Sequence, residues 1–235
     1  MSTPIPLLDK YKTEFNTKCF NTYSKHPYEW QSDIGSSMLQ SIHTTETAVH
    51  QLCIHPTGGD KSHLFTTLAA CLGQITLCIT PLLSLGVDQT FKHQNNTKSN
   101  STELNSPLHL DEVTKSEMKL PIDCCQSTAN SFSIIVYASL QSLVTKKTGP
   151  SDFLKFLLGH PNLLSMIVID EIHLLTDFGR SFRSKFQMFK NELFQKVKDT
   201  KLILFLTATC SGNLYSINSH FLRKFNWCHM QLLRW

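Results

Sequence analysis

The sequence lacks any long hydrophobic run: nowhere do about 18 consecutive apolar residues occur, the length that a membrane-spanning helix needs. The N-terminal residues also lack the basic segment and sustained apolar run of a secretory signal peptide. Charge of either sign is modest, at 17% charged residues and a net charge of +4, so a polyanionic partner is compatible with the composition but not required by it. We therefore expect an intracellular protein, nuclear if the source is eukaryotic, without a membrane partner.

The eight cysteines include no CxxC pair, so their spacing does not support a zinc site. Several lie inside apolar runs such as ITLCIT (75–80), where cysteine behaves as a small hydrophobic residue. We expect reduced, structural thiols rather than disulfides or metal ligands.

Short apolar runs recur along the chain and are separated by segments of helical length. A strand buried on both faces of a parallel sheet is apolar throughout, whereas a half-exposed strand alternates. This pattern predicts an α/β fold, a doubly wound parallel β-sheet flanked by helices. The predicted strands are QLCI (51–54), ITLCIT (75–80), FSIIVYA (132–138), LLSMIVID (163–170) and KLILFLTAT (201–209).

One long segment, residues 92–119, interrupts this rhythm. It is rich in Asn, Ser and Thr and poor in large apolar side chains. Such a segment buries too little apolar surface to offset the entropy lost on ordering. We expect a disordered surface insertion there.

The stretch HPTGGDKS (55–62) follows the first predicted strand and precedes a helical segment, the setting of a phosphate-binding loop. In that geometry Lys61 reaches the outer phosphates and the Ser62 hydroxyl binds Mg²⁺. The strict pattern GxxxxGK[ST] fails twice, since His55 and Asp60 replace its glycines. Taken alone, the stretch is equally compatible with an ordinary strand-to-helix turn. The cofactor-binding candidates in this loop are Thr57, Gly58, Gly59, Lys61 and Ser62.

The fourth predicted strand ends in IDEIH, which places Asp170 and Glu171 at its carboxyl end. Open α/β sheets bind ligands at that edge. Asp170 is the candidate Mg²⁺ ligand, through water, and Glu171 the candidate group that orients or deprotonates an attacking water. Solvated carboxylates also commonly follow strands, but the lysine loop upstream favours the catalytic interpretation.

Five motifs follow one another along the chain. They are PTGGDKS (56–62), ITPLLSLGVDQ (79–89), IVYASLQSL (135–143), IDEIHLLTDFGRSFR (169–183) and LTAT (206–209). Together and in this order they resemble the first RecA-like domain of RecQ-like superfamily 2 DNA helicases. The resemblance implies a P-loop NTPase fold that binds ATP and Mg²⁺, and an ATP-dependent DNA helicase of the 3′–5′ type acting on single-stranded or tailed duplex DNA.

The same resemblance assigns two further nucleotide-site residues. HPYEWQSDI (26–34) is similar to the adenine-reading segment, so Gln31 is expected to bond the adenine edge, although the spacing to Ile34 differs from that of typical RecQ sequences. An exposed glutamine that opens a helix is the alternative. His173 matches the histidine that relays the state of the γ-phosphate to LTAT.

Nucleic-acid contacts are expected at the positions that match the family's DNA-sensing elements. These are Thr80, Ser84, Phe178, Phe182 and Arg183. Stacking on aromatic side chains and contacts to phosphates carry such binding. Phe182 also begins a helical-spaced apolar stripe, so it fits a buried position equally well.

The expected organisation is an N-terminal extension (1–25), a helicase ATP-binding domain (26–210) and a C-terminal tail (211–235). No second RecA-like domain is expected within these residues, so a separately encoded second domain is a candidate partner and unwinding by this chain alone is doubtful. The alternative function is a non-catalytic nucleic-acid-binding remnant with a degenerate phosphate loop, which Asp60 favours.

Overall fold

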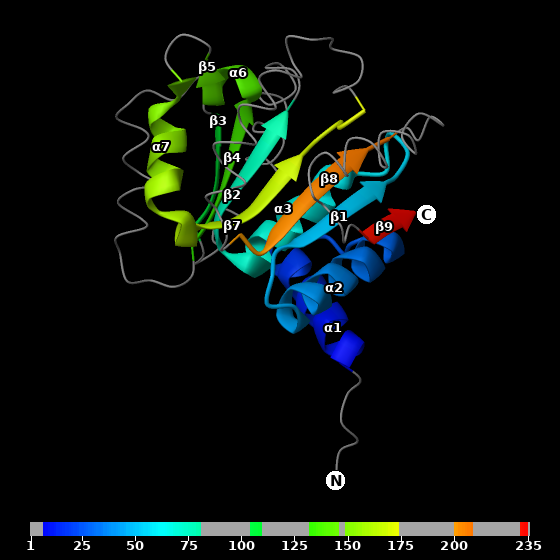
Figure 1. The fold of residues 1–235 in the computed structure, drawn as a ribbon. Helices are drawn as coiled ribbons and strands as arrows, with labels where there is room; N and C mark the ends of the chain where they lie inside the picture. Colours follow the sequence, from blue (N-terminus) through cyan, green and yellow to red (C-terminus); the bar gives the residue numbers. More distant parts are fainter. Residues whose placement is uncertain are drawn as a thin grey trace.

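The computed structural model describes residues 7–80, 104–109, 132–145, 149–173, 200–208 and 231–234. These residues form one parallel β-sheet with helices on both faces (Figure 1). Within these ranges no helix has both the length and the apolar character needed to cross a bilayer.

The main sheet has seven strands in the order β3-β4-β2-β7-β8-β1-β9, and every pair in it is parallel. All five predicted strands are present, so the predicted α/β doubly wound fold is confirmed. A short antiparallel pair, β5 (Val144–Thr145) and β6 (Gly149–Pro150), lies apart from it. The main strands are β1 (Val49–Ile54), β2 (Gln74–Thr80), β3 (Leu104–His109), β4 (Phe132–Ser139), β7 (Leu164–Ile169), β8 (Leu202–Thr207) and β9 (Gln231–Arg234).

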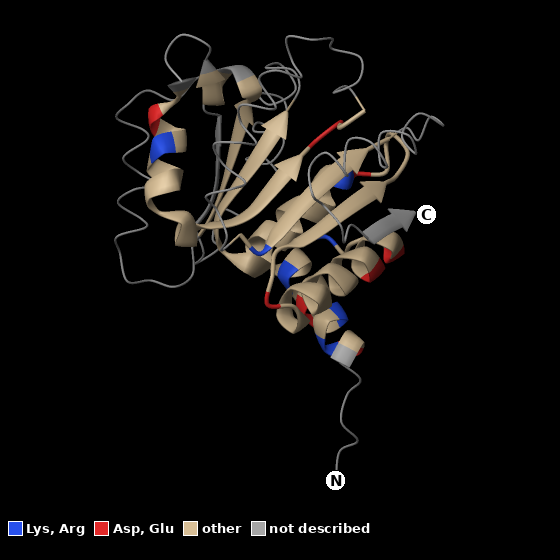
Figure 2. Cartoon of the chain, viewed as in Figure 1, with Lys and Arg blue, Asp and Glu red and all other residues tan. Residues whose placement is uncertain are grey.

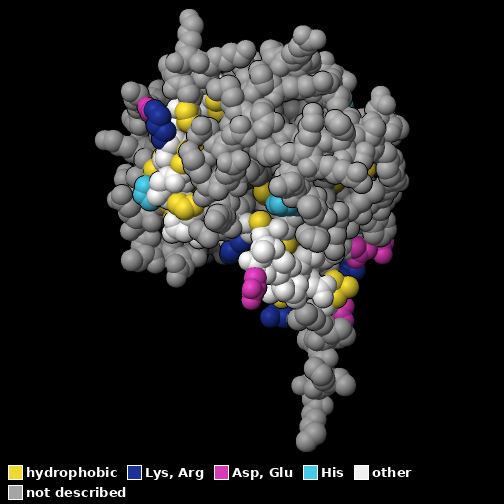
Figure 3. Space-filling model, viewed as in Figure 1, with side chains coloured by type: hydrophobic (Ala, Val, Ile, Leu, Met, Phe, Trp, Pro, Cys, Tyr) yellow, Lys and Arg dark blue, Asp and Glu magenta, His cyan; other side chains and the backbone are white. Residues whose placement is uncertain are grey.

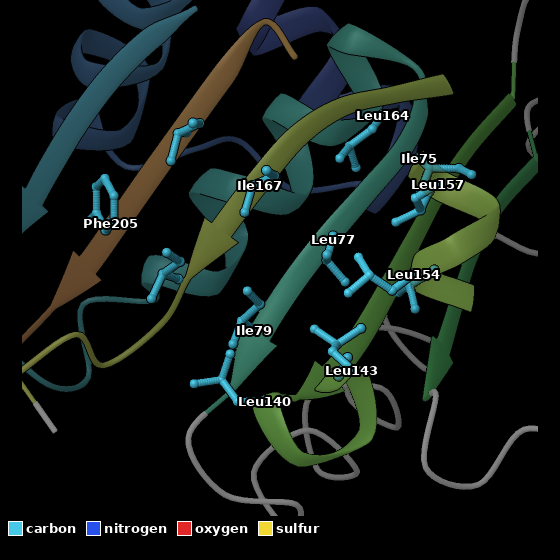
Figure 4. Packing of buried hydrophobic residues seen from close by; sticks show 14 of the residues in the cluster. Ile75, Leu77, Ile79, Leu140, Leu143, Leu154, Leu157, Leu164, Ile167 and Phe205 are labelled. Atoms are coloured by element: carbon cyan, nitrogen blue, oxygen red, sulfur yellow. The ribbon is translucent and has the colours of Figure 1, made fainter. Parts of the chain in front are cut away.

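Two hydrophobic cores cover the two faces of the sheet, because successive side chains of a strand point to opposite faces. On β2, the side chains of Ile75, Leu77 and Ile79 belong to the first core, whereas that of Cys78 belongs to the second. Figure 4 shows the first of these cores. It contains α6 (Leu140–Leu143), α7 (Asp152–Gly159) and the 3₁₀ turn Pro161–Leu163; the other contains α1 (Leu7–Tyr23), α2 (Glu29–Thr44) and α3 (Lys61–Leu72).

Two strands arise where the sequence predicted none. Residues 104–109, inside the predicted insertion 92–119, form β3 at one edge of the sheet, so the expectation of disorder is wrong for this part. Residues 231–234, inside the predicted tail, form β9 at the other edge. An edge strand pairs with only one neighbour and therefore need not be apolar on both faces. Backbone hydrogen bonding to β4 or β1 can thus order even a polar sequence such as LNSPLH. The other residues of 92–119 lie outside the described ranges.

The predicted N-terminal extension contains a helix that packs into the second core. Tyr11 and Phe15 of α1 are buried there, and the Phe15 ring lies against Gly35 of α2. A β-carbon added to Gly35 would lie 2.6 Å from two atoms of that ring. The glycine therefore permits the close crossing of α1 and α2.

Gly35→Ala is expected to lower the free energy of unfolding by about 1–3 kcal/mol, because the added methyl group overpacks a rigid ring. Chemical denaturation followed by circular dichroism measures this change. Gly159→Ala is the matched control, since a β-carbon there meets no atom of the described residues outside its own helical turn within 4 Å. Equal stability of the two variants would show that α1 does not pack on Gly35 in solution.

Candidate nucleotide-binding site

The strand order brings three polar segments to one edge of the sheet. β8 lies between β7 and β1, and all three run parallel, so their carboxyl ends lie together. Figure 2 shows acidic residues directly after β7 and both acidic and basic residues near the end of β1. The predicted phosphate loop (55–62) and IDEIH (169–173) thus flank the end of β8, the edge at which open α/β sheets bind ligands.

The loop after β1 leads directly into α3, whose first residue is Lys61. The Lys61 ammonium donates to the backbone carbonyls of His55 at 3.0 Å and Pro56 at 3.4 Å. Thr57 and Gly58 are exposed at the tip, and Gly58 has a φ of 81°, a conformation that favours glycine. An exposed loop before a helix N-terminus, with a lysine folded over it, fits a bound phosphate. The helix N-terminus favours negative charge, and the Lys61 ammonium can exchange its hydrogen bonds to two neutral backbone carbonyls for bonds to a phosphate.

Asp60 is the N-cap of α3 and has left-handed backbone angles, with φ 55° and ψ 46°. Aspartate tolerates this region better than most residues, but glycine adopts it without a steric penalty. The carbonyl of Asp60 accepts from the Gln31 amide at 2.9 Å and from the His63 backbone N–H at 3.0 Å. The backbone at Asp60 is therefore held from α2 and from α3, while its side chain is exposed.

His55 has a packing role that the sequence did not predict. Its ring stacks on Trp30, with centroids 3.9 Å apart and planes 14° apart. The same ring fills the space that a β-carbon on Gly59 would occupy. The His55 ring therefore leaves room for no side chain at position 59, whether or not a phosphate is bound. The only sign of this packing in the sequence was the histidine at the first glycine position of the motif.

The segment after β7 turns sharply at Glu171, a non-glycine residue with φ 48°. Its N–H donates to the Asp170 carboxylate at 2.9 Å, and Asp170 is only 7% exposed. The Glu171 Oε2 atom is buried, forms no hydrogen bond with another described residue and lies 3.2 Å from Nδ1 of His173 as a candidate ion pair. Strain and an unsatisfied carboxylate oxygen at one position are typical of a functional site.

Thr207, at the end of β8, connects the two segments. Its carbonyl accepts from the His55 N–H at 3.1 Å, and its hydroxyl lies 3.0 Å from Nδ1 of His173. Thr207 belongs to LTAT, for which the sequence predicted a coupling role without naming this residue. A movement at either segment therefore changes a contact of the same threonine.

α1 contacts the beginning of α3 through His63. Its Nε2 lies 3.1 Å from the Cys19 thiol, and its ring meets Tyr23 edge-on at 4.8 Å. Burial lowers the pKa of His63, and the negative charge of Asp60 opposes that shift. The imidazole is therefore mostly neutral at pH 7, and α1 supports α3 without adding positive charge near the loop.

The predicted nucleic-acid contacts are only partly within the described residues. Thr80, at the end of β2, is fully buried, so the expectation that it faces nucleic acid does not match this structure. Ser84, Phe178, Phe182 and Arg183 lie outside the described ranges. On the face in Figure 3, the described side chains of both charge signs are interspersed near α1 and α2, so these helices do not form a uniformly basic surface there.

A family model for DEAD/DEAH box helicases matches residues 34–217. The chain belongs to the DEAD/DEAH box helicase family. Similar proteins include the ATP-dependent DNA helicase RecQ of Bacillus subtilis, 27% identical over 73% of this chain and 26% of its own length. The putative ATP-dependent DNA helicase Q1 of Caenorhabditis briggsae is 29% identical over 76% of the chain and 27% of its own length. The RecQ-like resemblance of the motifs is thereby confirmed, and the chain spans about a quarter of the length of these relatives.

Solved helicase structures share the fold. The DEAD-box helicase Mss116, bound to single-stranded RNA and UDP-BeF, aligns with a TM-score of 0.60 at 14% identity, covering 97% of this chain and 44% of that one. The helicase domain of Pyrococcus furiosus Hef aligns with a TM-score of 0.56 at 17% identity, covering 87% of this chain and 37% of that one. The RecA-like architecture predicted from the sequence is therefore confirmed.

Proposed function

We propose that this chain is the ATP-binding motor domain of a RecQ-like DNA helicase. The observation that carries the proposal is the contact of Thr207 with both the phosphate loop and His173. A motor domain needs such a shared contact, because the state of the nucleotide must alter the structure beyond the nucleotide itself. Nucleotide binding alone would not require the two segments to share a residue.

In this proposal, ATP binds with its phosphates over the loop 57–62 and with Mg²⁺ near Ser62 and Asp170. Mg²⁺ prefers oxygen ligands, and a hydroxyl and a buried carboxylate at one sheet edge meet that preference. Glu171 orients the water that attacks the γ-phosphate, and its buried Oε2 is the acceptor for that water's proton. His173, 3.2 Å from that oxygen, senses its charge and transmits the change to Thr207.

Replacing Lys61 with alanine is expected to weaken Mg-ATP binding at least about tenfold, because the ammonium is the only positive side chain proposed to contact the triphosphate. Isothermal titration calorimetry measures the affinity. Lys201→Ala is the control, since Lys201 is exposed and lies just before β8, at the end of that strand opposite to the loop. Equal affinities of wild type and Lys61→Ala would place the nucleotide elsewhere.

For the nucleic acid we propose single-stranded or tailed duplex DNA, bound through Ser84, Phe178, Phe182 and Arg183. Combining Phe178→Ala with Arg183→Ala is expected to weaken binding of a labelled single-stranded oligonucleotide about tenfold or more, since one stacked base is worth about 1–3 kcal/mol. Fluorescence anisotropy at several salt concentrations measures this, and affinity should fall as salt rises. Lys155→Ala, on the exposed side of α7, is the control. Unchanged binding would assign the aromatic segment to the core.

A second RecA-like domain, on this polypeptide or a separate one, is part of the proposal, because helicases step by closing two domains on one nucleotide. A non-catalytic, nucleic-acid-binding remnant is the second candidate. The specific observation in its favour is the carboxylate of Asp60 beside the phosphate loop, which repels a triphosphate. ATP hydrolysis separates the two candidates.

A further inference from the structure

The carboxyl end of β2 lies beside Asp170, the proposed Mg²⁺ ligand. Ile79 of β2 pairs with Ile169 of β7, and the Ile79 carbonyl accepts from the Asp170 N–H at 3.0 Å. Thr80 is therefore level with Asp170 on the neighbouring strand, and neighbouring strands lie about 4.8 Å apart. Thr80 is 0% exposed and Asp170 is 7% exposed. A buried threonine and a buried carboxylate are thus neighbours at the edge where ATP is proposed to bind.

The side chains of Thr80 and Asp170 lie on the same face of the sheet. Cys78 of β2 and Val168 of β7 both belong to the second core, which contains α3. Side chains alternate along a strand, so the residues two positions further on lie on that face as well. These residues are Thr80 and Asp170. The same face carries the phosphate loop, because α3 begins at Lys61.

The negative charge of Asp170 acts on two buried side chains of that face. Burial raises the pKa of the Cys78 thiol, and the charge of Asp170 raises it further. Burial also raises the pKa of Tyr137 on β4, and the charge of Asp170 is among the smaller causes. Both Cys78 and Tyr137 belong to the second core. The Asp170 carboxylate therefore lies toward β2 and β4 on the α3 face, where Thr80 is.

A buried carboxylate has lost most of its hydration, so hydrogen-bond donors of the protein must replace the water. The Glu171 N–H is one such donor to Asp170, at 2.9 Å. On β2, Thr80 is the residue of this face that is level with the carboxylate, and its hydroxyl is a good donor. Cys78 is two residues further back and has only a weak S–H donor.

We propose that Thr80 is a positioning residue for Asp170: its hydroxyl donates to the carboxylate and holds it in the orientation that binds Mg²⁺. The inference rests on the proposed function, because Asp170 is the Mg²⁺ ligand there. Partners that orient a ligating carboxylate contribute about 10- to 100-fold to metal affinity. Thr80 thereby acts at the nucleotide site rather than as a contact to nucleic acid.

The test is calorimetric titration of ATP into wild type and Thr80→Val, once with saturating Mg²⁺ and once with EDTA, and again in the Asp60→Gly background to strengthen binding. Valine has nearly the shape of threonine but no hydroxyl. We expect Thr80→Val to weaken ATP binding in Mg²⁺ about tenfold or more, since the ligating carboxylate loses its orientation. Binding in EDTA should be nearly unchanged, because no cation is then held.

Thr76→Val is the matched control. Thr76 lies on the same strand and face and is also 0% exposed, and its hydroxyl forms no hydrogen bond with another described residue. This variant should bind ATP as wild type does in both conditions. Thr80→Ser keeps the hydroxyl and should retain the wild-type affinity in Mg²⁺. If circular dichroism shows that Thr80→Val does not fold, Thr80→Ala and Thr76→Ala provide the same comparison.

Unchanged affinity for ATP in Mg²⁺ when the Thr80 hydroxyl is removed would overturn the inference. An equal loss in Mg²⁺ and in EDTA would also overturn it, and so would a Thr80→Ser variant as weak as Thr80→Val, because either result would assign Thr80 to packing alone. Absence of ATP binding by both wild type and a folded Asp60→Gly variant would instead overturn the proposed function.

Discussion

Glu171→Gln is expected to reduce ATP hydrolysis by about 10²–10⁴-fold while leaving the affinity for Mg-ATP nearly unchanged. The glutamine amide has the same shape but no basic oxygen, so it cannot accept the proton of the attacking water. The buried Oε2 of Glu171, which forms no hydrogen bond with the other residues that the structure describes, is the oxygen concerned. Phosphate release in the presence of single-stranded DNA measures hydrolysis, and calorimetry measures binding.

Glu46→Gln is the matched control, because Glu46 is exposed and precedes β1, at the amino ends of the parallel strands, whereas Glu171 lies at their carboxyl ends. It should keep the wild-type rate. Residual hydrolysis above one tenth of the wild-type rate in Glu171→Gln would assign the general base elsewhere. A wild type and an Asp60→Gly variant that both bind Mg-ATP without hydrolysing it would favour the non-catalytic candidate.

Asp60→Gly is expected to tighten Mg-ATP binding by about 1–3 kcal/mol, or about 5- to 150-fold, the second of the two largest effects. A carboxylate close to a triphosphate repels it by up to about 4 kcal/mol per charge pair at 4 Å in a medium of dielectric near 20, and solvent and Mg²⁺ screen most of that. The Asp60 backbone already has a left-handed conformation that glycine adopts readily. The loop therefore need not rearrange when the side chain is removed.

Asp60→Asn separates charge from size, because asparagine keeps the β-carbon and also tolerates the left-handed region. If repulsion is the cause, both variants should bind Mg-ATP more tightly than wild type. Lys61→Ala in the Asp60→Gly background should abolish the gain. Equal Mg-ATP affinity of wild type, Asp60→Gly and Asp60→Asn would mean that the Asp60 carboxylate points away from the phosphates.

The pKa of His63 reports on the direction of the Asp60 carboxylate in the absence of nucleotide. Asp60 raises the pKa of His63 against the effect of burial, so removing the charge should lower that pKa further. Proton NMR titration of the imidazole in wild type and Asp60→Asn detects the shift. An unchanged pKa would show that the carboxylate is directed away from α1 and α3.

The sequence by itself determined the central sheet and the types of polar residue at its edge. Strands covered on both faces have to be apolar throughout, and β1, β2, β4, β7 and β8 are all apolar runs. Residue type also indicates chemistry, which is why Lys61, Asp170 and Glu171 are candidates that need no structure to be named. The edge strand β3 was missed because its pairing with β4, rather than its own composition, orders it.

Only the tertiary structure decided how the polar side chains of the site are used. Gln31 and Thr80 are buried by residues from other parts of the chain. Likewise, His55 stacks on Trp30, and Thr207 contacts both His55 and His173, so these contacts join segments that are distant in the sequence. A hydrogen-bonding group has the same donors and acceptors in any sequence context, but its partners depend on which segments the fold brings together. The sequence therefore determined which groups are at the site, and packing between α2, the loop and β8 decided which of them remain free to meet a ligand.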